Sequence, residues 1–166
     1  MHSLILLLGG NKGNTEKIFR SALTKLSECV GTVQQSSSLY SSESWGFFAD
    51  SAFLNQVLMV YTHLSADEAL QECLRIETEL GRERTCSLEY ESRSIDIDIL
   101  FYDSEVVDKP HLTIPHPHIQ HRRFTLEPLV ELIPNFVHPV LNQTTTELLQ
   151  NCTDSLWVHK VAPKTF

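Results

Sequence analysis

Two aspartates separated by one residue, Asp96 and Asp98, are the side chains whose type and spacing most directly suggest chemistry. They lie in segment 93–102, where isoleucine recurs at every second position, and this alternation predicts a β-strand with two faces. One predicted face carries Ile95, Ile97, Ile99 and Phe101, and the other carries Asp96, Asp98, Leu100 and Tyr102. Carboxylates two residues apart on one strand face are separated by about 7 Å.

Burying this carboxylate pair without compensation would be costly, because an ionised group loses its hydration in an apolar environment. A hard divalent cation such as Mg²⁺, shared with a phosphate-bearing substrate, would compensate the charge. The alternative is a solvent-facing strand edge that binds nothing. The spacing of the two aspartates alone leaves both interpretations open.

Arginines are concentrated just before this strand. Arg82, Arg84 and Arg93 fall within twelve residues, in an irregular stretch that leads directly into the acidic segment. Guanidinium groups bind phosphate oxygens and aspartates bind the metal, so the combination is typical of a site for a metal–polyphosphate. A solvated loop, in which these arginines pair with nearby glutamates, is the alternative.

A second group of residues could bind a flat heterocycle. Phe53 and Asn55 lie on one face of a strand predicted at 53–61, whose two largely apolar faces indicate a central position in a sheet. A phenyl ring could stack on the heterocycle while the amide hydrogen-bonds its edge; a core phenylalanine beside a satisfied asparagine is equally compatible. The loop at 43–50 contains three aromatic residues, which either pack down or close over a ligand.

The other elements alternate between strands and helices. Asn14 can cap a helix whose apolar stripe is Ile18, Ala22, Leu26 and Cys29, and Gly31 is expected to act as the helix stop. Ser65 and Glu68 form a capping box for a helix that ends at Gly81, with Glu77 expected to be half-buried. Further strands are expected at 3–8, 32–42 and 157–161, a hairpin at 105–108 and 112–114, and helices at 124–132 and after Thr144.

Three histidines, His116, His118 and His121, suggest a zinc site as a further alternative. Pro117 forces an extended backbone between them, and no cysteine or acidic residue falls at ligand spacing, so zinc is disfavoured.

Composition bounds the remaining possibilities. The chain has 166 residues, 42% hydrophobic and 20% charged, which predicts one soluble domain, 1–166, with a real core. The net charge of −8 and the lack of a Lys/Arg stripe argue against nucleic-acid binding. No apolar stretch is long enough to span a membrane, and the apolar start reads as a strand, not a signal peptide. Four scattered cysteines predict free thiols in a reducing cytoplasm.

Several motifs occur in one order along the chain: Leu8-Gly9-Gly10-Asn11, Trp45-Gly46-Phe47, Phe53-Leu54-Asn55, Leu80-Gly81-Arg82-x-Arg84, Arg93-x-Ile95-Asp96-Ile97-Asp98 and Ile114-Pro115-His116-Pro117 followed by Arg122-x-Phe124. Together they closely resemble the 6-hydroxymethyl-7,8-dihydropterin pyrophosphokinases of folate biosynthesis, over roughly residues 4–140. The resemblance implies a ferredoxin-like α+β fold with an antiparallel sheet and helices in three layers. It also implies transfer of the pyrophosphoryl group of ATP to the pterin hydroxymethyl oxygen, with release of AMP.

The resemblance also implies roles for individual residues. Asp96 and Asp98 would bind two Mg²⁺ ions, and Arg82 and Arg93 would act with them in catalysis. The pterin would be bound by Ser42, Trp45, Phe53, Asn55 and Phe124. ATP, as co-substrate, would be bound by Glu77, Arg84, Arg93, Ile99, Thr113, His116 and Arg122. The expected partners are therefore these small molecules alone, with the chain acting as a monomer.

The chain departs from the family pattern at four places: Gly10, segment 42–44, segment 90–92 and His111. We expect these departures to affect lid packing and ATP affinity and to spare the aspartate pair and the pterin wall. A non-catalytic ferredoxin-like module that binds a nucleotide or a protein is the rival hypothesis.

Overall fold

The strand at the centre of the fold is β1 (His2–Gly10), whose side chains are apolar on both faces. Leu4, Leu6 and Leu8 are fully buried on one face, and Ile5 and Leu7 are buried on the other. A strand that is apolar on both faces must be covered on both faces, so β1 requires two helical layers. The structure is a computed structural model that describes residues 1–46, 49, 51–82 and 93–162.

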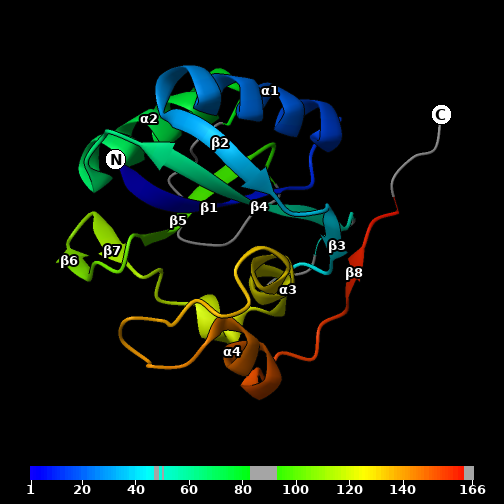
Figure 1. Cartoon of the computed structure of the whole chain (residues 1–166). Helices are drawn as coiled ribbons and strands as arrows, with labels where there is room; N and C mark the ends of the chain where they lie inside the picture. Colours follow the sequence, from blue (N-terminus) through cyan, green and yellow to red (C-terminus); the bar gives the residue numbers. More distant parts are fainter. Residues whose placement is uncertain (47–48, 50, 83–92, 163–166) are drawn as a thin grey trace.

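The main sheet is antiparallel throughout. Its strand order is β5 (Asp96–Tyr102), β1, β4 (Phe53–Thr62), β3 (Tyr40–Ser42) and β8 (Val158–Lys160), and β2 (Gly31–Ser36) also pairs with β4 (Figure 1). Helix α1 (Thr15–Cys29) connects β1 to β2, and α2 (Ala66–Glu79) connects β4 to β5. This is the βαββαβ order of a ferredoxin-like fold, so the predicted fold class is confirmed.

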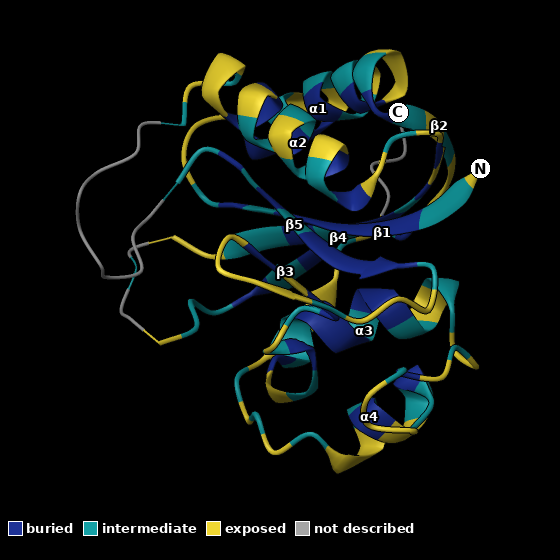
Figure 2. Cartoon of the chain, turned by 90° about the vertical axis from the view of Figure 1, so that its left-hand side faces the viewer, coloured by how far each residue is buried: buried dark blue, intermediate teal, exposed yellow. Residues whose placement is uncertain are grey.

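Helices cover the sheet on both faces, as the three-layer prediction requires (Figures 1 and 2). Helices α1 and α2 pack over one face, while α3 (Arg123–Leu132) and α4 (Thr145–Asn151) lie on the other. The Asn14 cap and the Ser65–Glu68 capping box both form as predicted. The predicted hairpin also forms, as β6 (Val107–Lys109) and β7 (Leu112–Ile114), and a short 3-10 turn spans Ile119–His121.

The predicted faces of the acidic strand are wrong beyond residue 100. Leu6 of β1 pairs with Ile99 and Ile5 pairs with Phe101, so Leu100 is an extra residue in β5. Because of this β-bulge, Leu100 and Phe101 both pack on the α3 side. Tyr102 returns to the isoleucine face, which inverts the faces predicted for Phe101 and Tyr102.

Two further features differ from the prediction: a strand boundary and the buried face of α1. Segment 32–42 forms two short strands, β2 and β3, because Ser37 interrupts it: its Oγ accepts a hydrogen bond from the backbone N–H of Val57 (3.0 Å). The apolar stripe of α1 contains Phe19, which is fully buried. Cys29, which was predicted in this stripe, is partly exposed. Among the described residues, no helix is long and apolar enough to cross a membrane.

Gly31 was predicted as a helix stop, which would require a left-handed backbone, but its φ is not positive. It lies at the start of β2, where a Cβ would be 2.1 Å from the carbonyl oxygen of Tyr61. Glycine is therefore required here by the close approach of two strands and not by backbone conformation.

We expect Gly31→Ala and Gly31→Asn both to lower the free energy of unfolding by at least about 1–3 kcal/mol, because either side chain overlaps the backbone of β4. Urea denaturation measures the loss. The matched control is Gly13→Asn, since Gly13 has φ +72° and its Cβ would lie no nearer than 3.7 Å to another residue. Asparagine tolerates the left-handed region, so this variant should change stability by less than about 1 kcal/mol. Tolerance of asparagine at Gly31 would contradict the close-approach explanation.

Candidate active site

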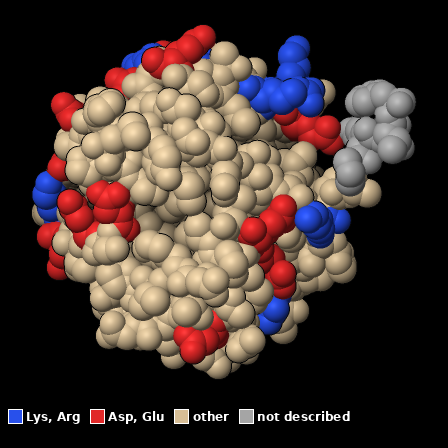
Figure 3. All heavy atoms as spheres, viewed as in Figure 1, with Lys and Arg blue, Asp and Glu red and all other residues tan. Residues whose placement is uncertain are grey.

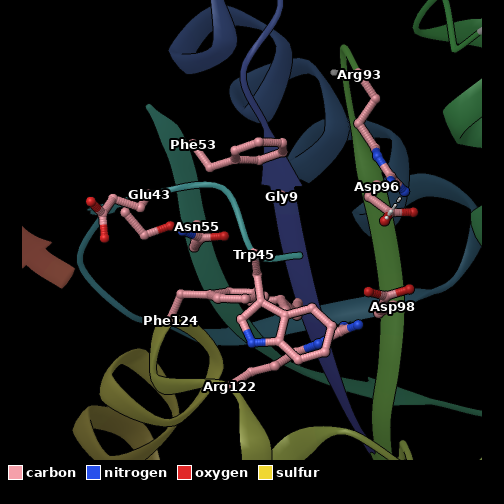
Figure 4. Close-up of a pocket in the computed structure, with 12 residues that line it drawn as sticks. Gly9, Glu43, Trp45, Phe53, Asn55, Arg93, Asp96, Asp98, Arg122 and Phe124 are labelled. Atoms are coloured by element: carbon pink, nitrogen blue, oxygen red, sulfur yellow. Dashed lines mark hydrogen bonds and ion pairs between the residues drawn. The ribbon is translucent and has the colours of Figure 1, made fainter. Parts of the chain in front are cut away.

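A pocket opens where the ends of β1, β3, β4 and β5 meet the start of α3 (Figure 4). It contains about 520 Å³ of space, including its open mouth. The lining residues are Leu7, Gly9, Ser42, Glu43, Trp45, Phe53, Asn55, Arg93, Asp96, Asp98, Arg122 and Phe124. The sheet therefore brings together residues that lie more than 100 positions apart in the sequence.

The floor of the pocket is set by the register of β1. Gly9 pairs with Asn55 of β4 on one side and with Asp96 of β5 on the other. Its neighbour Gly10 approaches β5 so closely that a Cβ there would lie 2.5 Å from the carbonyl oxygen of Ser94. The absence of a side chain at Gly10, noted above as a departure from the family pattern, thus allows this close approach.

Asp96 is held by two arginines at the edge of the pocket. Arg82 Nη1 donates to Asp96 Oδ1 (2.5 Å), and Arg93 Nη1 donates to Asp96 Oδ2 (2.6 Å). Arg82 follows α2 directly, after Gly81, whose φ of +86° ends the helix as predicted. Its backbone N–H donates to the carbonyl oxygen of Glu77 (3.0 Å), which fixes the turn that places its side chain beside β5.

Glu77 lies behind this ion-pair cluster and is 1% exposed, so the expectation of a half-buried side chain is wrong. Its Oε1 accepts a hydrogen bond from the backbone N–H of Ile97 (2.7 Å) and lies 2.6 Å from Arg82 Nη1. Burial and the negative charge of Asp96 raise the pKa of the Glu77 carboxyl, while Arg82 and the Ile97 N–H act in the opposite direction. Glu77 therefore connects α2 to the middle of the acidic strand.

Asp98 is the second carboxylate on the pocket wall (Figure 4). Burial raises the pKa of its carboxyl, and the negative charge of Asp96 raises it further. Arg122, Arg93 and Arg82 oppose this shift. Because burial and the charge of Asp96 disfavour ionisation of Asp98, a cation bound beside this wall would stabilise the Asp98 carboxylate.

An aromatic slot forms the other half of the pocket. The rings of Phe53 and Phe124 lie on opposite sides of the opening, with Asn55 between them at the back (Figure 4). Asn55 Nδ2 donates to Ser42 Oγ (2.9 Å), and both residues are 1% exposed. The guanidinium carbon of Arg122 lies 4.5 Å from the ring centroid of Trp45, a cation–π contact at the rim.

Comparison with known proteins decides the family. The family model for 7,8-dihydro-6-hydroxymethylpterin-pyrophosphokinase (HPPK) matches residues 5–134. The chain belongs to the HPPK family. The resemblance seen in the sequence motifs is therefore confirmed.

Two curated relatives support this membership. The 2-amino-4-hydroxy-6-hydroxymethyldihydropteridine pyrophosphokinase of Aquifex aeolicus is 36% identical over 147 residues, covering 89% of this chain and 90% of the relative. The folic acid synthesis protein fol1 of Pneumocystis carinii is 34% identical over 161 residues, covering 97% of this chain but only 21% of that longer protein.

Solved structures agree on the fold. A crystal structure described as HPPK-DHPS in complex with substrates superimposes with a TM-score of 0.74 at 14% identity, covering 90% of this chain and 43% of that one. At that level of identity the likeness supports the ferredoxin-like fold alone.

Nine of the site residues expected for an HPPK member line the pocket, whereas Ile99, Thr113 and His116 are not among its lining residues. Ile99 is buried on the α1/α2 face, opposite the aspartates, and Thr113 is exposed on β7. His116 lies beside β5, where its backbone N–H donates to the Leu100 carbonyl oxygen (3.0 Å). Burial, followed by the positive charge of Arg122, lowers the pKa of His116 to about 4. Arg84 and the rest of segment 83–92 lie outside the described residues.

Three lining residues were not predicted as site residues: Leu7, Gly9 and Glu43. Leu7 and Gly9 enter through the pairing register of β1, which the sequence does not reveal, whereas Glu43 belonged to the predicted aromatic loop.

Among the described residues, no group of three or more His, Cys, Asp or Glu side chains is arranged to hold a metal ion, and this includes the histidine tract. On the face seen in Figure 3, charged side chains of both signs are scattered around uncharged surface.

Glu77→Leu should lower the free energy of unfolding by about 1–3 kcal/mol, because the buried Ile97 N–H and the Arg82 guanidinium both lose an acceptor. Glu77→Gln retains an oxygen for Ile97 and should cost less. Urea denaturation compares both with Glu72→Gln, on an outer face of the same helix, which should stay within about 0.5 kcal/mol of the wild type. If Glu77→Leu were as stable as Glu72→Gln, the buried acceptor role would be refuted.

Proposed function

We propose that this chain transfers the pyrophosphoryl group of ATP to the hydroxymethyl oxygen of 6-hydroxymethyl-7,8-dihydropterin and releases AMP. The observation that carries the proposal is that one pocket joins an aromatic–amide slot to an aspartate pair flanked by arginines. The first half suits a flat heterocycle and the second half suits a metal-bound polyphosphate. Family membership supports the same reaction.

The slot supplies stacking surfaces and a hydrogen-bonding edge for the pterin. A ring inserted between Phe53 and Phe124 would meet Asn55 and Ser42 along its edge. Because Asn55 Nδ2 already donates to Ser42 Oγ, the Asn55 Oδ1 atom is left as an acceptor for a ring N–H or amino group. Both residues are buried, so a ligand without matching donors would leave a polar atom unpaired at a cost.

The acidic wall fits Mg²⁺. Asp96 and Asp98 offer two carboxylates, and no cluster of three ligating side chains exists in the described part of the chain. Mg²⁺ is usually held in this way, by one or two carboxylates with phosphate and water completing its six ligands. Bound there, the two proposed Mg²⁺ ions would neutralise charge on the polyphosphate.

The arginines are placed to bind the phosphates. Arg82 and Arg93 reach the pocket edge from the two ends of segment 82–93, and Arg122 enters from the start of α3. Pyrophosphoryl transfer requires positioning and charge stabilisation more than covalent chemistry, so no nucleophilic side chain is needed. We further propose that the chain acts as a monomer on small-molecule substrates. We also propose a cytoplasmic location, which agrees with the free thiols of Cys29, Cys73 and Cys152 among the described residues.

Mixing the protein with ATP, Mg²⁺ and the reduced pterin alcohol should yield AMP. Asp96→Asn and Asp98→Asn should each lower kcat by at least about 100-fold, because the charge that binds the cation is lost while the shape is kept. Nucleotides are separated and quantified by chromatography. Formation of ADP, or no nucleotide turnover by the wild type, would refute the proposal and favour a non-catalytic module.

The matched control for these aspartates is Asp108→Asn, because Asp108 is exposed on β6, outside the pocket. It should turn over ATP at the wild-type rate. Retained activity in Asp96→Asn or Asp98→Asn would contradict the metal assignment even if AMP is the product.

The aromatic slot can be tested separately. Phe53→Ala and Phe124→Ala should each raise the Kd of the pterin alcohol by about 10-fold or more, since stacking on one aromatic ring contributes about 0.5–1.5 kcal/mol beyond the area that it buries. The Kd of a non-hydrolysable ATP analogue should change by less than about twofold. Calorimetry measures both constants, and equal losses for the two ligands would show that the slot does not discriminate the pterin.

A further inference from the structure

Helix α3 begins with an unusual cap that comes from the end of the chain. Its own N-cap residue, Arg122, makes no side-chain capping hydrogen bond. Instead, Asp154 Oδ2 accepts a hydrogen bond from the backbone N–H of Arg123 (3.0 Å), the first residue of the helix. A carboxylate at a helix N-terminus satisfies an otherwise unpaired N–H and interacts favourably with the helix dipole.

The same segment also binds the side chain of Arg123. Arg123 Nε donates to the backbone carbonyl oxygen of Asp154 (3.0 Å), and Nη2 donates to the carbonyl oxygen of Cys152 (3.3 Å). Arg123 stands between Arg122 and Phe124, which both line the pocket. The position of these two pocket residues therefore depends on contacts with residues about 30 positions later in the chain.

A few residues farther on, the chain contacts the end of β3, which also lines the pocket. Strand β8 pairs with β3, with Val158 opposite Ser42. Trp157 and Glu43 are joined twice: the Trp157 N–H donates to Glu43 Oε2 (3.2 Å), and the Glu43 N–H donates to the Trp157 carbonyl oxygen (3.4 Å). Ser42 and Glu43 are the lining residues at the end of β3.

We propose that residues 152–160, here called the C-terminal strap, set the width of the aromatic slot and thereby its affinity for the pterin, with Asp154 as the main positioning residue. This inference rests on the proposed function. One end of the strap fixes the start of α3, which carries Phe124, and the other fixes the end of β3, which carries Ser42. In Figure 1 the strap runs from α4 past α3 to β8, beside β3.

Helix α3 also contacts β3 and β8 directly, near the end of the helix. Glu131 of α3 accepts a hydrogen bond from the Tyr40 hydroxyl of β3 (2.6 Å) and lies 3.4 Å from Lys160 Nζ of β8. Helix α3, β3 and the strap thus form a closed set of contacts around one side of the slot. Because stacking requires two walls at a fixed separation, a shift of about 1 Å at the start of α3 is enough to weaken binding.

The test compares the Kd of the pterin alcohol, measured by calorimetry with Mg²⁺ and a saturating non-hydrolysable ATP analogue, in full-length variants. Asp154→Ala removes the cap and should raise this Kd by about tenfold, within the range that a misplacement of about 1 Å can cause. Asp154→Asn keeps a capping oxygen and should retain most of the affinity. The Kd of the ATP analogue should change less than that of the pterin.

Thr144→Ala is the matched control, because Thr144 caps α4 through its own side chain (3.2 Å from Glu147 N) and α4 does not line the pocket. It should lower Tm as much as Asp154→Ala does and leave the pterin Kd unchanged. The strap is refuted if Asp154→Ala keeps the wild-type Kd, or if both ligands weaken equally.

A replacement variant and the wild-type protein complete the test. If Asp154→Ala does not fold, Asp154→Glu, which displaces the carboxylate by one methylene, replaces it under the same criteria. Failure of the wild-type protein to bind the pterin would refute the proposed function itself, which separates that outcome from failure of the strap.

Discussion

The pairing register of β1 is the constraint on which the rest of the site depends. Gly9 stands in register between Asn55 and Asp96, so this one strand holds the heterocycle half and the polyphosphate half of the pocket side by side. Strands are spaced about 4.8 Å apart, which puts these two residues about 10 Å from each other across Gly9. A slip of one residue would turn the aspartates to the opposite face. The apolar side chains on both faces of β1, buried under helices on each side, prevent that slip.

The acidic wall creates an electrostatic problem that the fold solves with loops. Asp96 and Asp98 face one pocket and Glu77 lies behind them, and the charge of Asp96 raises the cost of ionising both Asp98 and Glu77. The nearby arginines come from three separate connections: the end of α2, the approach to β5 and the start of α3. Arg93 is only three residues from Asp96, but Arg82 and Arg122 reach the wall because α2 and α3 pack on opposite faces of the sheet. The site is therefore a product of the whole fold and not of one local motif.

Sequence patterns predicted the parts of this arrangement that depend on residue type. Alternating isoleucines located the acidic strand, and the capping box located α2, because both signals are local. The pattern failed at Leu100, where the bulge depends on how β5 pairs with β1 and inverts the faces of the next two residues. The prediction for Gly31 failed for a similar reason, because glycine is required there by the close approach of β4, which is distant in the sequence. The burial of Glu77 depends on how α2 packs over β5, and the periodicity of apolar residues predicts the orientation of that helix only approximately.

The same distinction separates residues that do chemistry from residues that place them. Carboxylates, guanidinium groups and aromatic rings cannot be exchanged for other types, so they leave recognisable motifs, and the family match covers them within residues 5–134. Apart from the Asp154 carboxylate, the contacts of the C-terminal strap described above are mostly made by main-chain atoms: the carbonyl oxygens of Cys152 and Trp157 and the ladder of β8. Many residue types could present those atoms. Its contribution therefore leaves no motif in the sequence, although in the structure it contacts both the start of α3 and the end of β3.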